Sequence, residues 1–130
     1  MTDEQGRPMR ILIVEDEPVI AFELEQTLID AGFEIVGVAG RLEEGLAIVE
    51  SGALDAAVVD ANLHRVSAAP IATALTARGL PFIVTTGYFR EQLPVEFQPG
   101  TLIEKPCCPE QLIETLRSLL EPQQMHDPLR

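Results

Sequence analysis

The sequence predicts an α/β fold with a doubly wound, five-stranded parallel sheet. Two observations lead to this prediction. Short continuous apolar runs, which are typical of strands buried on both faces, recur five times along the 130 residues. Segments with helical spacing of apolar residues lie between these runs, and glycine or proline marks most of the junctions. Such alternation favours a parallel sheet whose right-handed crossovers place helices on both faces.

The apolar runs give the strands in chain order. We expect them at about residues 10–14, 34–38, 56–59, 82–85 and 101–104. Between the last two strands the helical pattern is poor. Residues 89–93 have helical character, but Pro94 and Pro99 prevent a long helix. The fourth helix of the fold is therefore expected to be short or irregular.

Four other segments have a clear helical pattern. The first begins at about Pro18, which suits a first helical turn, and Gly32 closes it. The second spans about residues 42–50, and the third starts near Pro70. The last starts at Pro109 and carries the clearest apolar stripe, which consists of Leu112, Ile113, Leu116, Leu119 and Leu120.

Length and composition indicate one domain at residues 9–121, with loose termini at 1–8 and 122–130. No apolar stretch approaches the roughly 18 residues of a membrane span, so membrane insertion is not expected. The two adjacent cysteines, Cys107 and Cys108, cannot form a disulfide framework. They favour a reducing, cytoplasmic setting, and ordinary reduced thiols are the preferred interpretation over a redox switch.

The formal charge is −12, from 21 acidic against 9 basic side chains. Nucleic-acid binders use clusters of lysine and arginine to displace counterions, and this chain has no such cluster. Direct nucleic-acid binding is therefore not expected. The acid surplus suits a domain that holds a divalent cation, but it also serves solubility alone.

Polar groups follow four of the predicted strands. Glu15 and Asp16 come after the first, Asp60 ends the third, Thr86 follows the fourth, and Lys105 follows the fifth and is the only lysine. The carboxyl ends of parallel strands meet at one edge of the sheet, where ligands bind in this class of fold. We therefore expect these groups to converge.

The converging residue types suit phosphoryl transfer. Asp60 is a competent nucleophile that would form an acyl phosphate. Mg²⁺ prefers oxygen ligands, for which Asp16 and Asp60 are the obvious carboxylates. Glu15 would contribute through water and Asn62 through its main-chain carbonyl.

The remaining two groups would meet the phosphoryl oxygens. Lys105 would pair with one of them, or with Asp60 when the site is empty, and the hydroxyl of Thr86 would donate to another. Each element also has an ordinary structural explanation. Glu15 and Asp16 suit a helix N-terminus, and Asp60 suits a cap or turn. His64 reads better as a solvated loop histidine than as a phosphate relay or metal ligand.

The quoted motifs resemble the receiver domain of bacterial response regulators over about residues 9–121. The run from Ile11 to Glu17 is similar to the family's acid pocket, Val58-Val59-Asp60 to its phosphoacceptor strand, and Lys105-Pro106 to its Lys-Pro, whose peptide bond is typically cis. The resemblance implies a flavodoxin-like receiver fold. It also implies Mg²⁺-dependent phosphorylation of Asp60 by a histidine kinase or phosphotransfer protein, which the receiver itself catalyses.

A closer likeness lies in the fourth strand. Pro81-Phe82-Ile83-Val84-Thr85-Thr86-Gly87-Tyr88 resembles the Pro-Phe-x-Phe-Ala-Thr-Gly-Tyr signature of a variant receiver group, often single-domain. Leu102 stands where ordinary receivers carry a switch aromatic. The ordinary switch is therefore not expected, and Thr86 and Tyr88 are the switch candidates. For Tyr88 the alternative is an amphipathic residue at a strand end without a signalling role.

Two alternative functions agree less well with the sequence. An aspartate-nucleophile phosphatase needs a second acid two residues after the nucleophile, but position 62 is Asn. A binding module that never takes phosphate is disfavoured by the complete set of site residues. The favoured function is a single-domain response regulator, which is not an enzyme toward other substrates. Its output would be through protein–protein contacts or as a phosphate sink.

Overall fold

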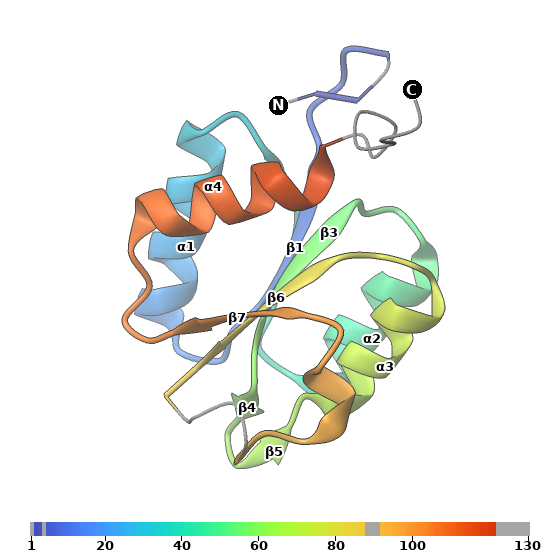
Figure 1. Ribbon diagram of the computed structural model, residues 1–130, viewed down its shortest axis with the longest axis vertical. Helices are drawn as coiled ribbons and strands as arrows, with labels where there is room; N and C mark the ends of the chain where they lie inside the picture. Colours follow the sequence, from blue (N-terminus) through green and yellow to red (C-terminus); the bar gives the residue numbers. More distant parts are fainter. Residues whose placement is uncertain (1, 4, 88–91, 122–130) are drawn as a thin grey trace, which may run out of the picture.

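The computed structural model describes residues 2–3, 5–87 and 92–121. It confirms the predicted fold class, with a parallel sheet of five strands in the order β2-β1-β3-β6-β7 (Figure 1). The strands are β1 (Arg10–Val14), β2 (Glu34–Ala39), β3 (Ala56–Asp60), β6 (Phe82–Thr86) and β7 (Thr101–Glu104). They begin at the expected residues, and three of them extend one residue further than the apolar runs indicate. The assignment of residues 9–121 to one domain stays a prediction.

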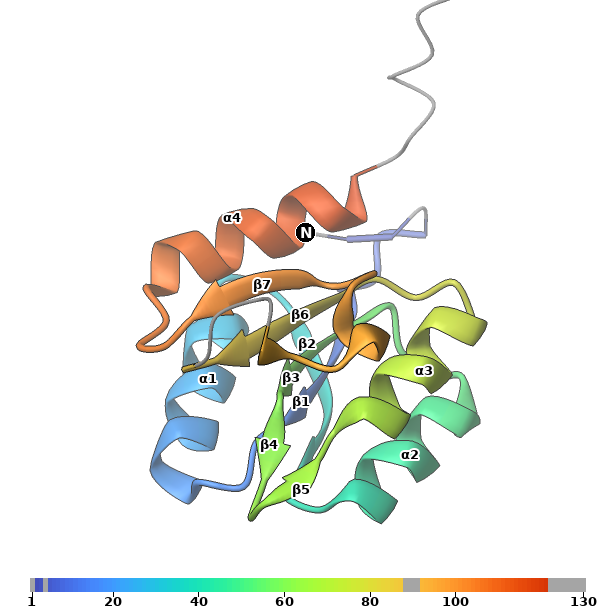
Figure 2. The ribbon, with the colours of Figure 1, turned by 60° about the horizontal axis from the view of Figure 1, so that its bottom comes forward.

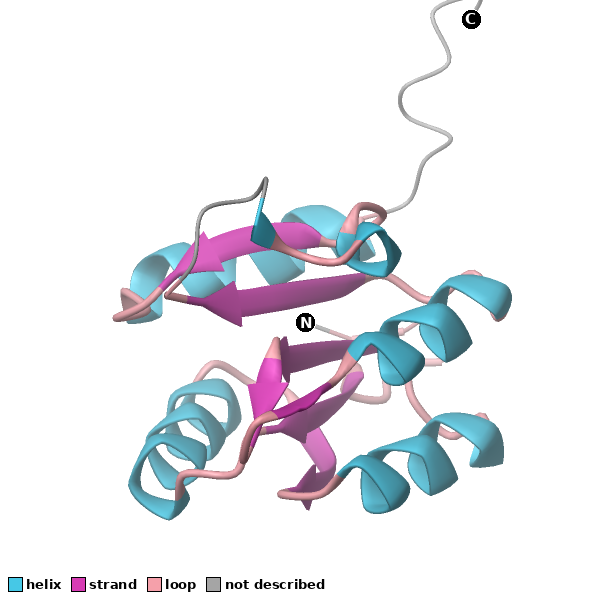
Figure 3. Cartoon of the chain, turned by 90° about the horizontal axis from the view of Figure 1, so that it is seen from below, coloured by secondary structure: helices cyan, strands magenta, loops and turns pink. Residues whose placement is uncertain are grey.

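Helices cover both faces of the sheet (Figures 1 and 3). α1 (Pro18–Asp30) and α4 (Pro109–Leu120) pack on one face, and α2 (Leu42–Ser51) and α3 (Ala69–Ala77) pack on the other. Proline lies in the first turn of α1, α3 and α4, where its missing N–H has no helical partner to lose. No helix in the described ranges is long and apolar enough to cross a membrane.

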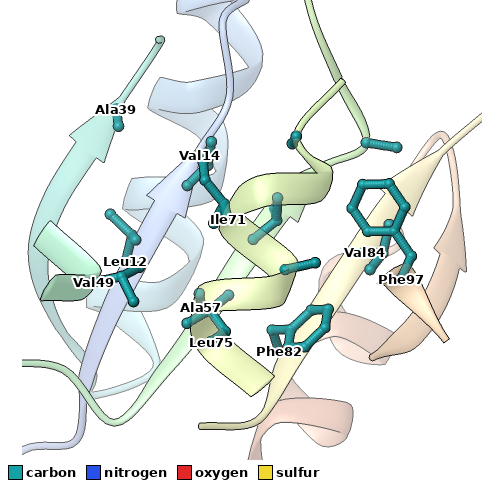
Figure 4. Close-up of a cluster of buried hydrophobic side chains, with 14 of the residues drawn as sticks. Leu12, Val14, Ala39, Val49, Ala57, Ile71, Leu75, Phe82, Val84 and Phe97 are labelled. Atoms are coloured by element: carbon teal, nitrogen blue, oxygen red, sulfur yellow. The ribbon is translucent and has the colours of Figure 1, made fainter. Parts of the chain in front are cut away.

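Alternation along the buried strands divides the core into two clusters, one on each face. The cluster toward α2 and α3 includes Leu12, Val14, Ala57, Phe82 and Val84 (Figure 4). The cluster toward α1 and α4 takes the alternate residues of the same strands, such as Ile11, Ile13, Val58 and Ile83. Fully burying an aliphatic or aromatic side chain of this size contributes about 1.5–3 kcal/mol. Both faces therefore hold the strands rigidly below the edge where they end.

The described part of the segment where the fourth helix was expected contains no α-helix, in agreement with a short or irregular element. Among the described residues between β6 and β7, Gln92 has 3-10 conformation, and a 3-10 turn, η2 (Val95–Phe97), follows, whose Phe97 packs into the core. Pro94 begins this turn, and Gly100 ends the segment against the ring of Phe82, where any Cβ would overlap the ring. Residues 88–91 lie outside the described ranges.

A two-stranded hairpin after β3 was not predicted; the sequence indicated a loop there. β4 (Asn62–Leu63) pairs antiparallel with β5 (Val66–Ser67) (Figure 2). His64 and Arg65 form its two-residue turn, with φ of 47° and 69°. Positive φ at both positions is the geometry that hairpin turns favour, but it is usually supplied by Asn and Gly. The hairpin was missed because His-Arg carries no such signal.

Candidate functional site at the carboxyl edge of the sheet

The acids of β1 and β3 meet because these strands are neighbours. Their register pairs Val14 with Val59, so Glu15 and Asp60 leave the sheet at the same level. One carboxylate oxygen from each of Glu15, Asp16 and Asp60 lies within 4.8 Å of the others. Residues 44 positions apart in the chain are thus brought into one acidic cluster.

Lys105 reaches the same cluster from the edge strand β7. Its Nζ lies 3.1 Å from Asp60 Oδ2 and 3.8 Å from Glu15 Oε1. The main-chain N–H of Lys105 donates to the Thr86 carbonyl at 2.9 Å, which fixes the base of the side chain, and the peptide bond to Pro106 is cis. Partial burial pulls the pKa of Lys105 down, but the charge and hydrogen bond of Asp60, with the charges of Glu15 and Asp16, raise it overall. The ammonium is therefore held charged.

Burial and a neighbouring charge destabilise the ionised form of Glu15. Only 3% of the residue is exposed, and burial followed by the charge of Asp60 raises its pKa from 4.5 to about 7. Its Oε2 accepts the Glu17 N–H at 3.2 Å, whereas its buried Oε1 has no hydrogen-bond partner among the described residues. A buried carboxylate oxygen in this state is an available ligand for a cation.

The hairpin turns the main-chain polar groups of Asn62 toward Asp60. The Asn62 N–H donates to Asp60 Oδ1 at 3.2 Å. The flanking pairs of the hairpin bond across it: Ala68 N–H donates to the Ala61 carbonyl, and Leu63 pairs with Val66 at the turn. In an antiparallel ladder, pairs that hydrogen-bond to each other alternate with pairs that do not. Asn62 and Ser67 form a pair of the second kind, so the N–H and carbonyl of Asn62 point away from β5. The carbonyl thus faces the side on which the N–H meets Asp60.

Thr86 ends β6 with 2% of the residue exposed, and its neighbour Thr85 pairs in register with Asp60. The two threonines differ in direction, because successive side chains of a strand point to opposite faces. The buried Thr85 hydroxyl has no hydrogen-bond partner within the part of the chain that the structure describes. Tyr88, the second switch candidate, lies outside the described residues.

Asp16 has a partner that sequence reasoning missed. The main-chain N–H of His64 donates to Asp16 Oδ2 at 2.9 Å, and His64 Nδ1 lies 3.2 Å from the same oxygen. The side chain of His64 is 77% exposed, so the interpretation as a solvated loop histidine is right for the ring. Nothing in the sequence indicates the contact, since the two residues are 48 positions apart and the hairpin itself was not predicted.

The two cysteines are free thiols, Cys107 half-buried and Cys108 exposed. Burial raises the pKa of the Cys107 thiol, which disfavours the reactive thiolate. The structure thus favours the interpretation of Cys107 as an ordinary thiol beside the site.

The residues present fit a small hard cation. Three carboxylates supply oxygen ligands only, and oxygen atoms on opposite sides of a Mg²⁺ ion lie about 4.2 Å apart, given metal–oxygen distances of 2.0–2.1 Å. The three carboxylate oxygens all lie within 4.8 Å of one another, which is compatible with this span. The buried Glu15 Oε1 is the observation that shows the fit best, because a water bound to the ion would satisfy it.

The sequence and the fold match known proteins. The family model of the response regulator receiver domain matches residues 11–117. The transcriptional regulatory protein PdtaR of Mycobacterium tuberculosis is 31% identical over 87 residues, which are 66% of this chain and 42% of that protein. The chain thus spans less than half the length of this curated relative.

Solved structures give the same result. A CheY-like receiver domain protein from Methanospirillum hungatei is 29% identical, with a TM-score of 0.81 over 92% of this chain and 99% of that one. SdrG from Sphingomonas melonis is 36% identical, with a TM-score of 0.75 over 88% and 98%. A structure of SdrG in a BeF3-activated conformation gives a TM-score of 0.70 over 86% and 96%, at the same identity. Since the family model covers most of the sequence and the sheet order is that of CheY-like receivers, the chain belongs to the response regulator receiver domains of two-component signalling.

Proposed function

We propose that this receiver accepts a phosphoryl group on Asp60 in a reaction that depends on Mg²⁺ or another small divalent cation. The observation that carries the proposal is the convergence of three carboxylates and the single lysine ammonium, which lies 3.1 Å from Asp60 Oδ2. The family is not one of classical enzymes. The only chemistry proposed for this chain is its own phosphorylation and dephosphorylation.

The transfer requires positioning more than covalent assistance from the protein. A carboxylate oxygen of Asp60 forms the new bond to phosphorus while the bond from phosphorus to the donor breaks, and the donor keeps the electron pair and takes a proton from solvent. Lys105 turns from Asp60 to an equatorial oxygen of the phosphoryl group. Thr86 contributes its hydroxyl from the end of the neighbouring strand.

Asp16 and Asp60, with the Asn62 carbonyl, are the proposed direct ligands of the cation, and Glu15 contributes through water. When bound, the cation supplies positive charge beside the transferring group. Glu15 is largely shielded from bulk solvent, which strengthens its interactions with neighbouring charges.

The donor that we propose is a phosphohistidine of a histidine kinase or a histidine phosphotransfer protein. Direct binding of nucleic acid is not proposed, because the chain has no basic cluster. Output is through protein–protein contacts or as a phosphate sink. The similarity to SdrG, which has a structure in a BeF3-activated conformation, supports a change of state at this site. Membership of the variant group with its distinctive fourth strand stays a prediction.

The test is incubation with acetyl phosphate and Mg²⁺, followed by intact-mass spectrometry. We expect one added phosphoryl group, which is labile in base as acyl phosphates are, and no addition in Asp60→Asn. Asp55→Asn is the matched control, because this acid precedes the same strand and lies at the other end of the sheet. Labelling that persists in Asp60→Asn would remove Asp60 as the nucleophile.

A further inference from the structure

Hairpin β4–β5 contacts two acids of the cluster, one at the end of β3 and one just after β1. At its base, the Asn62 N–H donates to Asp60 Oδ1, and at its turn the His64 N–H donates to Asp16 Oδ2. Asp60 itself belongs to β3, from which the hairpin continues (Figure 2). A stretch of only a few residues therefore links the acid at the end of β3 to the acid after β1.

The turn holds an unfavourable backbone conformation. His64 and Arg65 both have positive φ, at 47° and 69°, although each carries a Cβ. In the described ranges, all other residues with positive φ are glycines. Residues in sparsely populated conformations persist where the surrounding structure determines them, and they concentrate at functional sites. Here the conformation directs the His64 N–H at Asp16.

The main chain of His64, rather than its ring, makes the stronger contact. The imidazole is 77% exposed, and its Nδ1 lies 3.2 Å from Asp16 Oδ2, whereas the N–H is 2.9 Å from that oxygen. An exposed side-chain pair contributes little, because water and salt screen it. The Asp16 side chain is only 11% exposed, so its carboxylate meets this N–H in a largely enclosed position.

We propose that the left-handed turn at His64 positions Asp16 for the divalent cation, an inference that rests on the proposed function of the acidic cluster. The His64 N–H holds one oxygen of the carboxylate and thereby restricts its rotation. A ligand that is already oriented loses less conformational freedom when the ion binds. His64 is thus a positioning residue that acts through Asp16, and its effect resides in backbone conformation.

Two substitutions separate the backbone from the ring. His64→Gly and His64→Val both remove the imidazole and keep the N–H, but glycine adopts positive φ readily and a β-branched residue does not. The measurement is the Mg²⁺ dissociation constant of the purified chain, taken from amide shifts in an NMR titration. We expect His64→Gly to bind within about twofold of wild type, because it keeps the contact. We expect His64→Val to bind about 5- to 30-fold more weakly, because only the minor left-handed population is competent.

Asp16→Asn separates this inference from the proposed function. Unchanged Mg²⁺ affinity in Asp16→Asn overturns the proposed ligand set itself. Loss of affinity in Asp16→Asn, together with equal affinities for His64→Gly and His64→Val, overturns the positioning role alone.

Hydrogen exchange of the His64 amide in Mg²⁺-free protein provides a second test that does not depend on the folding of His64→Val. We expect this amide to exchange faster in Asp16→Asn than in wild type, because a neutral side chain accepts the hydrogen bond less strongly. The Gly45 amide, which donates to the carbonyl of Arg41 just before α2, is the control and should not change. Equal exchange of the His64 amide in both proteins overturns the inference.

Discussion

The two ends of strands β1 and β3 differ in charge balance: one end carries a matched acid and base, and the other carries more acids than bases. At the end where the strands begin, Arg10 meets Asp55 through its main-chain N–H at 2.7 Å and through Nε and Nη2 at 3.2 Å each. The Asp55 N–H returns a bond to the Arg10 carbonyl at 2.8 Å. One acid and one base thus satisfy each other. At the other end, Glu15, Asp16 and Asp60 share the single ammonium of Lys105.

The pKa values show what this difference means. Burial would raise the pKa of Asp55, but the hydrogen bonds and charge of Arg10 lower it overall. Burial and the charge of Asp60 instead raise the pKa of Glu15 to about 7. The balanced pair stabilises the charges that it contains, whereas the acidic cluster holds an excess of negative charge that a bound cation would offset. The comparison teaches that excess charge, rather than charge itself, distinguishes a candidate site from a structural pair.

The largest expected effect distinguishes Lys105, in the acidic cluster, from Arg10, in the structural pair. Lys105→Ala should slow phosphorylation of Asp60 by acetyl phosphate about 100-fold, since it removes the preorganised charge that meets the incoming group. Mg²⁺ affinity should be largely intact, because no proposed ligand is lost. The measurement is the rate of mass gain at saturating Mg²⁺, with Arg10→Ala as the control at wild-type rate. A wild-type rate in Lys105→Ala would place this lysine outside the site.

The next effect, on Mg²⁺ affinity, distinguishes Asp16 in the acidic cluster from Asp55 in the structural pair. Asp16→Asn should weaken Mg²⁺ binding at least about tenfold, because even the loss of an outer partner of a metal site typically costs 10- to 100-fold. Asp55→Asn should leave Mg²⁺ affinity unchanged. Calorimetric titration of both variants checks this difference. Equal weakening in both would show that total charge, rather than ligation, determines the affinity.

A smaller effect is the pH dependence of stability in cation-free protein. Folding raises the pKa of Glu15 above its ordinary 4.5, so the folded state holds this proton more tightly. The stability from the protonated group is complete below pH 4.5 and is lost as pH rises toward 7. The loss is on the order of 2 kcal/mol. Urea unfolding of wild type and Glu15→Gln at several pH values measures it. A constant difference between the two proteins from pH 4.5 to 7 contradicts the shift.

The smallest effect has the opposite sign. The lowered pKa of Asp55 means that its contribution to stability is present above its ordinary 3.8 and is lost as acid titrates the folded group. Asp55→Asn should therefore lower the urea midpoint at neutral pH. The variant should also lose less stability than wild type when the pH is lowered. Phosphorylation should be unaffected. A midpoint equal to that of wild type would show that the Arg10–Asp55 pair contributes nothing measurable.

The sequence was sufficient for the sheet because its strands are buried on both faces. Runs such as Ile11 to Val14 have no polar residue to disguise them, and the polar groups just beyond them follow from the rule that parallel strands share a carboxyl edge. The convergence of Asp60 and Lys105 could be predicted for this reason. Their chemical roles stay predictions.

The missed features depend on conformations that the local residues do not signal. The turn at His64 and Arg65 forms without the Asn-Gly pair that marks such turns. The contact of His64 with Asp16 depends on that turn, and the pairing of Arg10 with Asp55 depends on strand register. Register and turn type are set by packing over many residues, so single residues did not reveal these contacts.

The position of β7 has a consequence for the maturation of the chain. β7 is the last strand among the described residues and lies at the edge of the sheet, and it delivers Lys105 to an aspartate 45 residues earlier. Contacts between distant residues form late, because the entropy of closing the loop opposes them. An incompletely folded chain would hold the acids without their ammonium. On the proposed function, efficient phosphorylation of Asp60 would therefore begin only after the edge strand docks and brings Lys105 to the acids.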